Sequence, residues 1–252
     1  MVQAIILAGG RGTRLAPYTT VFPKPLVPIG EVPILEIILR QLKAQGIQET
    51  TLAVGYLSEL IKAYISQRPA LTDGHRISYH DELEPTGTAG SLASIDRPAE
   101  TFLVMNGDVL TNLRLADMLA HHRAHDAVLT IATARRDVKI DLGVLDIGDD
   151  NRITGYREKP SLHYDVSMGM YLMEPRVLDL VAPNEYLDFP DLVLRLLATG
   201  ERVSSYMSGA LWLDIGRHDD YERAVELFEE HRDSFLDALE RSSAPARVLI
   251  HV

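Results

Sequence analysis

Three basic side chains lie near the N-terminus. Arg11 and Arg14 belong to a glycine-rich turn over residues 9–14, and Lys24 follows it by ten residues. An apolar run over residues 4–8 leads directly into this turn. Glycines let backbone N–H groups approach a phosphate closely because no Cβ stands in the way. The cations would supply the charge that a triphosphate needs, and the first thirty residues contain no Asp or Glu. The pattern predicts a phosphate-handling site, although a bare glycine turn could also be a tight strand-to-helix connection.

A carboxylate with suitable surroundings for a metal follows a second apolar stretch, in Met105-Asn106-Gly107-Asp108. Ligands of α/β sheets bind at the carboxyl ends of the strands, where Asp108 would lie. Mg²⁺ is commonly held by one or two carboxylates together with phosphate oxygens of the substrate. Asn-Gly-Asp is also a common turn, so a structural role for Asp108 stays open at this point.

The composition narrows the classes of partner. The chain of 252 residues has a net charge of −11 and contains no cysteine, which excludes disulfides, thiolate chemistry and Cys-based zinc sites. An acidic protein is a poor candidate for nucleic-acid binding, and no apolar run approaches the roughly 18 residues of a membrane span. We therefore expect neither nucleic acid nor membrane as a partner. A cytoplasmic location follows by default.

Strand-like and helix-like segments alternate in the first half, which predicts βαβ units and a largely parallel sheet. From about Asp141 the pattern becomes β-rich. Strands are expected at residues 2–8, 51–55, 76–80, 101–105, 128–134, 142–147, 152–157, 166–173 and 202–207. Helices are expected at residues 34–42, 58–66 with Ser58 as N-cap, 87–95, 115–123, 190–197 and 219–239.

The segments Leu7–Leu15 and Pro23–Leu26 resemble the signature of the sugar-1-phosphate nucleotidylyltransferases, in which an LAGGxGTRL loop is followed by PKPL. The resemblance extends from Met1 to about Glu230 and is to mannose- and heptose-1-phosphate guanylyltransferases in particular. It implies an α/β, Rossmann-like (GT-A-like) fold: a mixed, mainly parallel sheet with helices on both faces and a β-rich sugar-binding lobe. Residues 1–252 would form one domain, with a nucleotide-binding half (about 1–135), a sugar-phosphate-binding half (about 136–235) and a tail (236–252).

The resemblance also implies the reaction NTP + sugar 1-phosphate → NDP-sugar + pyrophosphate, with Mg²⁺ as cofactor. Arg14, Lys24 and Asp108 would be the catalytic residues. The segment Trp212–Gly216 resembles the family's WLDxG motif, so Asp108 and Asp214 would hold the metal. The nucleotide-binding residues implied are Leu7, Gly9, Gly10, Gly12, Thr13, Arg14, Lys24, Glu82, Gly87 and Thr88.

The sugar phosphate has its own set of implied residues. Glu158-Lys159-Pro160 resembles the family's EKP motif, whose glutamate holds sugar hydroxyls and whose lysine binds the phosphate. Gly143 would contact the sugar through its backbone, and Gly169 would lie in the sugar pocket. Many members read Asn-Ala-Gly-Ile-Tyr where this chain has Ser167–Tyr171, so the ring substituents that are recognised can differ.

Glu82 bears on the choice of base. Thymidylyl- and uridylyltransferases of the family commonly have Gln five residues before the glycine that corresponds to Gly87, whereas Glu82 occupies that position here. An ionised carboxylate only accepts hydrogen bonds. Guanine presents two adjacent donors, N1–H and the N2 amino group, which one carboxylate can accept together. GTP is therefore the favoured nucleotide, provided that Glu82 does not simply point into solvent.

Alternative functions remain open. A thymidylyl- or uridylyltransferase acting on glucose 1-phosphate differs only in its base pocket, and a non-catalytic, nucleotide-sugar-binding regulatory subunit would keep the same fold. A glycosyltransferase of similar architecture should show an Asp-x-Asp metal motif, and the nearest approach to one, Asp146 with Asp149 and Asp150, lies in a turn-like stretch. The sequence also leaves open whether the protein forms a homo-oligomer, and whether the apolar end of the tail docks on the body or on another subunit.

Overall fold

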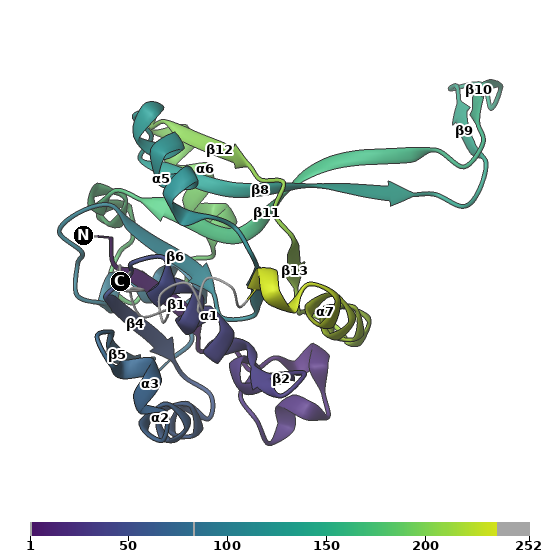
Figure 1. The fold of residues 1–252 in the computed structure, drawn as a ribbon. Coiled ribbons are helices and arrows are strands. Elements are labelled where there is room, and N and C mark those ends of the chain that lie inside the picture. The colour runs from purple at the N-terminus through teal and green to yellow at the C-terminus, as the bar shows by residue number, and fades with distance from the viewer. Residues whose placement is uncertain (1, 83, 236–252) are drawn as a thin grey trace, which may run out of the picture.

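The computed structural model describes residues 2–82 and 84–235, and a seven-stranded sheet forms its centre (Figure 1). In order across the sheet the strands are β12 (Val203–Met207), β8 (Leu129–Lys139), β11 (Ser161–Met173), β6 (Phe102–Asn106), β1 (Ala4–Ala8), β4 (Glu49–Val54) and β5 (Arg76–Asp81). Strand β11 is antiparallel to both of its neighbours, and the other neighbouring pairs are parallel. The predicted mixed, mainly parallel sheet is confirmed.

Helices cover both faces of the sheet (Figure 1). They are α1 (Ile34–Ala44), α2 (Ser58–Ser66), α3 (Pro69–Thr72), α4 (Gly87–Gly90), α5 (Leu115–Ala124), α6 (Phe189–Ala198) and α7 (His218–Glu230). Neighbouring residues of a strand face opposite sides of a sheet. Accordingly, Ile6 belongs to one buried cluster with side chains of α1, and Ile5 to a second with side chains of α6. Two apolar layers therefore hold the sheet between helices, as was predicted.

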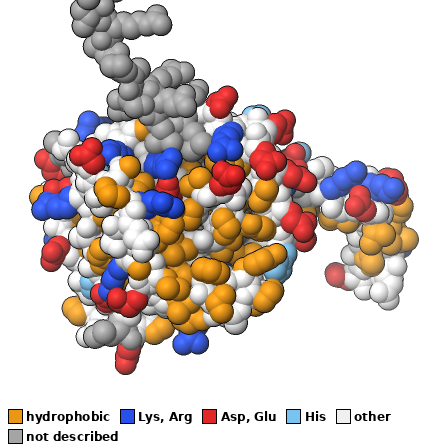
Figure 2. Space-filling view, turned by 60° about the horizontal axis from the view of Figure 1, so that its bottom comes forward, with side chains coloured by type: hydrophobic (Ala, Val, Ile, Leu, Met, Phe, Trp, Pro, Cys, Tyr) orange, Lys and Arg blue, Asp and Glu red, His pale blue; other side chains and the backbone are white. Residues whose placement is uncertain are grey.

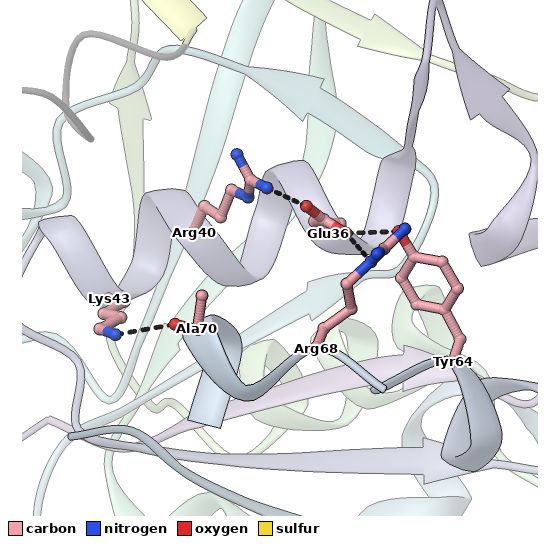
Figure 3. A network of polar contacts seen from close by, with 6 residues as sticks. All are labelled: Glu36, Arg40, Lys43, Tyr64, Arg68 and Ala70. Carbon is pink, nitrogen blue, oxygen red and sulfur yellow. Dashed lines mark hydrogen bonds and ion pairs between the residues drawn. The ribbon is translucent and has the colours of Figure 1, made fainter. Parts of the chain in front are cut away.

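A buried carboxylate on α1 joins this helix to α2 and to the turn that follows α2 (Figure 3). The side chain of Glu36, on α1, is 4% exposed. It accepts hydrogen bonds from Arg40 on the same helix and from the hydroxyl of Tyr64 on α2. The Arg68 guanidinium lies 3.5 Å from the same carboxylate. A buried charge is costly unless it is paired and hydrogen-bonded, and here the partners come from separate elements, so the network ties α2 and its following turn to α1.

Strands β8 and β11 continue beyond the sheet as a two-stranded arm that projects from the body (Figure 1). The pairs run from Thr133 with Ser167 to Lys139 with Ser161, without a register shift. At the far end lies the hairpin of β9 (Val144–Ile147) and β10 (Ile153–Arg157). The predicted strands at residues 128–134 and 166–173 are thus much longer than expected. The β-rich second half includes this arm as well as strands of the central sheet.

Shorter strands complete the body. They are β2 (Pro28–Ile29), which pairs with β3 (Val32–Pro33), and β7 (Val109–Thr111), which pairs with β13 (Trp212–Asp214). Short 3₁₀ helices occur at Thr13–Leu15, Tyr18–Thr20, Lys24–Leu26, Ser91–Ser94 and Pro175–Leu180. None of the helices within residues 2–82 and 84–235 combines the length and apolar character of a membrane span.

Three local predictions need correction. Ser58 is the first residue of α2 and not its N-cap, because the left-handed Leu57 precedes it and no side chain caps the helix. The expected helix at 87–95 is a turn of α4 followed by a 3₁₀ segment. The final helix ends at Glu230, and a turn at His231 separates it from a further helical turn at 232–235. The rest of that predicted helix and the tail lie outside the described residues.

Candidate active site

A cleft of about 810 Å³ lies where the central strands end. Turns that follow β1, β4 and β5 contribute to its wall, together with the end of β6. This is the edge at which open α/β sheets bind their ligands. The cleft brings together all of the predicted nucleotide, catalytic and metal residues: Leu7, Gly9, Gly10, Gly12, Thr13, Arg14, Lys24, Glu82, Gly87, Thr88, Asp108 and Asp214.

The glycine turn shapes one wall of the cleft. Gly12 has a φ of +61°, a left-handed conformation that glycine adopts at little cost. Its carbonyl oxygen accepts a hydrogen bond of 2.9 Å from the Leu15 amide, which starts a turn of 3₁₀ helix that carries Arg14. A Cβ on Gly12 would lie 3.0 Å from the Cβ of Lys24. The turn therefore places both predicted cations beside one another at the same wall.

Lys24 and Asp108 meet in an ion pair between Nζ and Oδ2. Their side chains are 12% and 19% exposed. The other carboxylate oxygen of Asp108, Oδ1, is buried and lacks a hydrogen-bond partner among the described residues. Buried polar atoms are normally satisfied, so this oxygen is available to a ligand.

Asp214 lies beside Asp108 because β13 pairs with β7. The pairing sets Asp214 opposite Val109, and the Ile215 amide donates a hydrogen bond of 3.1 Å to the Asp108 carbonyl. Burial raises the pKa of the Asp214 carboxyl, and the negative charge of Asp108 raises it further. No group of three or more acidic, His or Cys side chains within the described ranges could hold a metal. The two neighbouring aspartates could still share one with oxygens of a ligand.

Glu82 points into the cleft and not into solvent. The residue is half-buried, and a Cβ on Gly9 would come within 3.0 Å of its Oε2. Removal from water disfavours the charged form of a carboxyl group, and burial raises the pKa of Glu82 accordingly. Glu82 therefore lies where it could contact a bound base, as the prediction of GTP requires.

Gly87 and Thr88 line the cleft by docking onto a distant segment. A Cβ on Gly87, whose φ is +81°, would lie 2.5 Å from the Leu187 carbonyl oxygen, so only glycine fits there. The amide and hydroxyl of Thr88 lie 2.9 and 3.1 Å from Oδ1 of Asp188. Gly87 thus packs closely against the backbone of Leu187, and the amide and hydroxyl of Thr88 are both hydrogen-bonded to Asp188.

Several further cleft residues were not among the predicted site residues. Tyr186 and Asp188 arrive through the docking of Gly87, and no local motif marks them. Ser91 is 1% exposed, and its hydroxyl has no hydrogen-bond partner within the described part of the chain. Arg11 stacks over the Tyr56 ring at 5.7 Å. The cationic character of Arg11 was visible in the sequence, whereas the other residues depend on tertiary packing.

The predicted sugar-phosphate residues fall into two places. Gly169 is buried in the body, where its φ is +73° and a Cβ would lie 2.7 Å from the side-chain nitrogen of Asn106, a cleft residue. Gly143, Glu158 and Lys159 are exposed at the end of the arm, and none of them lines the cleft. The structure therefore does not bring the EKP-like motif to the cleft of the same chain.

The end of the arm is nevertheless an ordered cluster. The Tyr156 hydroxyl donates a hydrogen bond of 2.7 Å to the Glu158 carboxylate. A Cβ on Gly143 would lie 2.2 Å from that hydroxyl, so a side chain at this position would have to displace the Tyr156 ring. Lys159 has a φ of +44°, a strained conformation for a residue other than glycine. Glu158 and Lys159 are thus held in a defined geometry away from the body.

Comparison with known proteins places this geometry in a family. The Nucleotidyl transferase family matches residues 3–231. Mannose-1-phosphate guanylyltransferase 1 of Arabidopsis thaliana is 32% identical over 98% of this chain and 68% of its own length. UTP–glucose-1-phosphate uridylyltransferase of Synechocystis is 31% identical over 89% of this chain and 62% of its own length.

A solved structure resembles the fold described above. HddC from Yersinia pseudotuberculosis, crystallised in complex with GMP-PN, aligns with a TM-score of 0.70 and 26% identity over 90% of this chain and 100% of its own. The extent of the family match and the curated relatives at about one-third identity lead to one conclusion: the chain belongs to the nucleotidyl transferase family, as a sugar-1-phosphate nucleotidylyltransferase.

Proposed function

We propose that this protein transfers the guanylyl group of GTP to a sugar 1-phosphate, with Mg²⁺ as cofactor, and releases pyrophosphate and a GDP-sugar in the cytoplasm. The observation that carries the proposal is the convergence of Arg14, Lys24, Asp108 and Asp214 on one cleft. Two cations and two carboxylates in one place suit a triphosphate with its metal, and they would be an expensive arrangement without a ligand.

The residues present fit a magnesium ion. Asp108 offers a buried oxygen that no described residue contacts by a hydrogen bond. Burial raises the pKa of the Asp214 carboxyl, and the negative charge of the neighbouring Asp108 raises it further. A cation between them would relieve that repulsion. Asp108 and Asp214 would hold the ion, which would neutralise charge on the phosphate oxygens of the nucleotide.

The side chains of this chain would then orient and stabilise two polyanions. An oxygen of the sugar phosphate attacks the α-phosphorus, a new P–O bond forms there, and the bond to the departing pyrophosphate breaks. The attacking oxygen is ionised at neutral pH, so no general base is needed. Arg14 and Lys24 would stabilise the charge on the α-phosphate and on the pyrophosphate, and alignment of the two substrates supplies the remaining acceleration.

Glu82 and Ser91 support the choice of guanine. The Glu82 carboxylate faces the cleft beside Gly9 and can accept both donors of the guanine edge, N1–H and N2–H. Uracil and thymine offer one donor between two acceptors, which a carboxylate would repel. The buried Ser91 hydroxyl lines the same cleft, has no hydrogen-bond partner among residues 2–82 and 84–235, and provides one further polar contact for the nucleotide.

For the sugar phosphate we propose Gly143, Glu158, Lys159 and Gly169, on the basis of the motif resemblance. Lys159 would balance the charge of the incoming phosphate, and Glu158 would accept hydrogen bonds from sugar hydroxyls. A mannose-type sugar is favoured because the Arabidopsis relative is a mannose-1-phosphate guanylyltransferase. A uridylyl transfer to glucose 1-phosphate is the second candidate, since the Synechocystis relative carries that name.

The proposal is tested by measuring pyrophosphate release from each NTP with mannose, glucose and heptose 1-phosphates, with Mg²⁺ and with a chelator. We expect the fastest release with GTP, and none without the metal. Asp117→Asn, an exposed aspartate on α5, is the control that should leave the rate unchanged. Release with UTP or dTTP alone would contradict the base assignment, and no release with any pair would support a regulatory nucleotide-sugar-binding protein instead.

A further inference from the structure

The end of the arm carries apolar side chains that nothing else in the described chain covers. On paired positions of the hairpin, Ile147 faces Ile153 and Leu145 faces Tyr156, and each of the four is exposed. Figure 2 shows hydrophobic side chains at this end, clear of the body. An isolated two-stranded hairpin is marginally stable in water, and contiguous exposed apolar surface commonly marks an interface.

The cleft of the same chain lacks what the arm carries. Its basic residues are Arg11, Arg14 and Lys24, and Lys24 is already paired with Asp108. All three lie on or next to the glycine turn, which suits the triphosphate. A second phosphorylated substrate needs its own positive charge against the repulsion of the first. The cleft is therefore complete for a nucleotide and incomplete for a sugar phosphate.

The arm is poorly suited to close over its own cleft. Its strands are paired without interruption from Thr133 and Ser167 outwards, and it points away from the body (Figure 1). Folding the arm back would break these backbone hydrogen bonds. The freed N–H and C=O groups would cost free energy wherever they were then buried without new partners. An arm of this kind reaches another molecule more readily than its own chain.

The cleft of a second copy offers a matching surface. Between the cleft residues Arg14 and Lys24, the segment over residues 16–23 exposes the apolar side chains of Val21 and Phe22 by 65% and 55%. An arm that arrives there would set its apolar end against this segment and bring Lys159 to the neighbouring phosphates. Two copies related by a two-fold axis would each lend an arm and receive one, which closes the assembly.

We infer that two copies of this chain exchange arms, so that the hairpin of one copy, with Glu158 and Lys159, completes the sugar-phosphate site in the cleft of the other. This inference rests on the proposed function for the role of Lys159, but not for the dimer itself. The resulting enzyme is an obligate dimer with two composite sites. Neither copy alone brings all of the residues that hold the sugar phosphate to one cleft.

The first test is the mass of the protein in solution, measured by light scattering after size-exclusion chromatography. A dimer is expected for the unaltered chain and a folded monomer for Ile147→Asp at the end of the arm. Leu194→Asp on α6 is the matched control, because both side chains are 62% exposed; it should stay dimeric. An unaltered chain that is monomeric, or a dimer that Ile147→Asp leaves intact, would overturn the inference whether or not the protein has the proposed activity.

The second test asks whether the arm acts on the partner's cleft. Asp108→Ala inactivates a cleft and keeps its arm, whereas Lys159→Ala inactivates an arm and keeps its cleft. Each variant alone should be nearly inactive. Heterodimers, co-expressed with two affinity tags and purified in tandem, should regain about half of the wild-type rate, because one of their two composite sites is intact. Inactive heterodimers beside an active wild type would show that each arm serves its own cleft and would refute the exchange.

Discussion

Lys24 and Asp108 form an ion pair in the cleft through Nζ and Oδ2, while Oδ1 of the same aspartate is buried and has no hydrogen-bond partner in the described part of the chain. The predicted triphosphate cation and the predicted metal ligand are thus in direct contact. One carboxylate oxygen orients the lysine, and the other remains free for a ligand. A Cβ on Gly12 would lie 3.0 Å from the Cβ of Lys24. The glycine turn therefore packs closely against this ion pair.

The first prediction concerns Asp108→Asn. An amide keeps the shape of the side chain but removes the charge that would hold Mg²⁺ and orient Lys24. We expect kcat to fall by about 10²–10³, which is the usual loss when one preorganised electrostatic group is removed. The Mg²⁺ concentration for half-maximal rate should rise as well. The measurement is pyrophosphate release over a magnesium titration, and equal magnesium curves for variant and wild type would refute a role in metal binding.

The second prediction follows from Asp214, whose pKa is raised by burial and by the charge of Asp108. A protonated carboxyl is neutral and cannot hold a cation. Because the pKa is raised, Asp214 takes up its proton at a higher pH than a free aspartate does, so apparent Mg²⁺ affinity should be lost as pH falls through that raised value. In Asp214→Asn the part of this pH dependence that Asp214 causes should be absent. Magnesium titrations of both proteins at a series of pH values provide the measurement, and parallel pH curves would count against this role.

The same shift affects the stability of the protein without ligands. A carboxyl whose pKa is higher in the folded than in the unfolded chain stabilises the fold at pH values below its unfolded pKa, and this contribution is lost as pH rises through the folded pKa. At neutral pH Asp214→Asn should therefore raise the melting temperature of the metal-free protein. The gain should shrink in acid, which thermal unfolding at two pH values can measure. A lower melting temperature at neutral pH would contradict the cause assigned to the shift.

The fourth prediction concerns Glu36 in the helix network (Figure 3). Glu36→Ala leaves Arg40, Arg68 and the Tyr64 hydroxyl without their common acceptor. The buried charge itself is removed and the arginines are partly exposed, so the main loss is the acceptor of the Tyr64 hydroxyl, and leaving a buried polar group unsatisfied typically costs about 1–3 kcal/mol of unfolding free energy. Glu59→Ala is the matched control, because Glu59 is 84% exposed and pairs with Lys62 on the surface. Denaturant unfolding of the two variants should separate them clearly.

The body of the fold was predictable because its signals are local. Buried strands such as β1 and amphipathic helices such as α1 follow directly from apolar periodicity. The arm was not predictable in this way, since residues 135–139 are mostly charged and carry no strand pattern of their own. Their extended conformation comes from pairing with β11, which is a tertiary property.

The site residues likewise divide into those that local sequence signals predict and those that depend on tertiary contacts. The nucleotide residues follow the carboxyl ends of parallel strands, so the rules of α/β sheets bring Gly9, Glu82 and Asp108 to one edge. The position of Lys159 depends on the direction of a long ribbon, and no sequence rule determines that direction. Asp188 was missed because its segment reaches the cleft by docking onto Gly87 and Thr88, which is a tertiary contact.

The last prediction concerns the base. In Glu82→Gln one acceptor oxygen becomes an amide donor, so the side chain can no longer accept both N1–H and N2–H of guanine, while it can pair with the donor–acceptor edge of uracil or thymine. A site that leaves a buried polar group unpaired loses affinity steeply. We expect the ratio of kcat/KM for GTP over UTP to fall about 10²-fold or more, by analogy with other hydrogen-bonding sites. Glu84→Gln, an exposed neighbour outside the cleft lining, should leave the ratio unchanged. If both variants kept the GTP preference of the wild type, recognition of guanine would have to come from other cleft residues, of which the unpartnered Ser91 hydroxyl is the first to test.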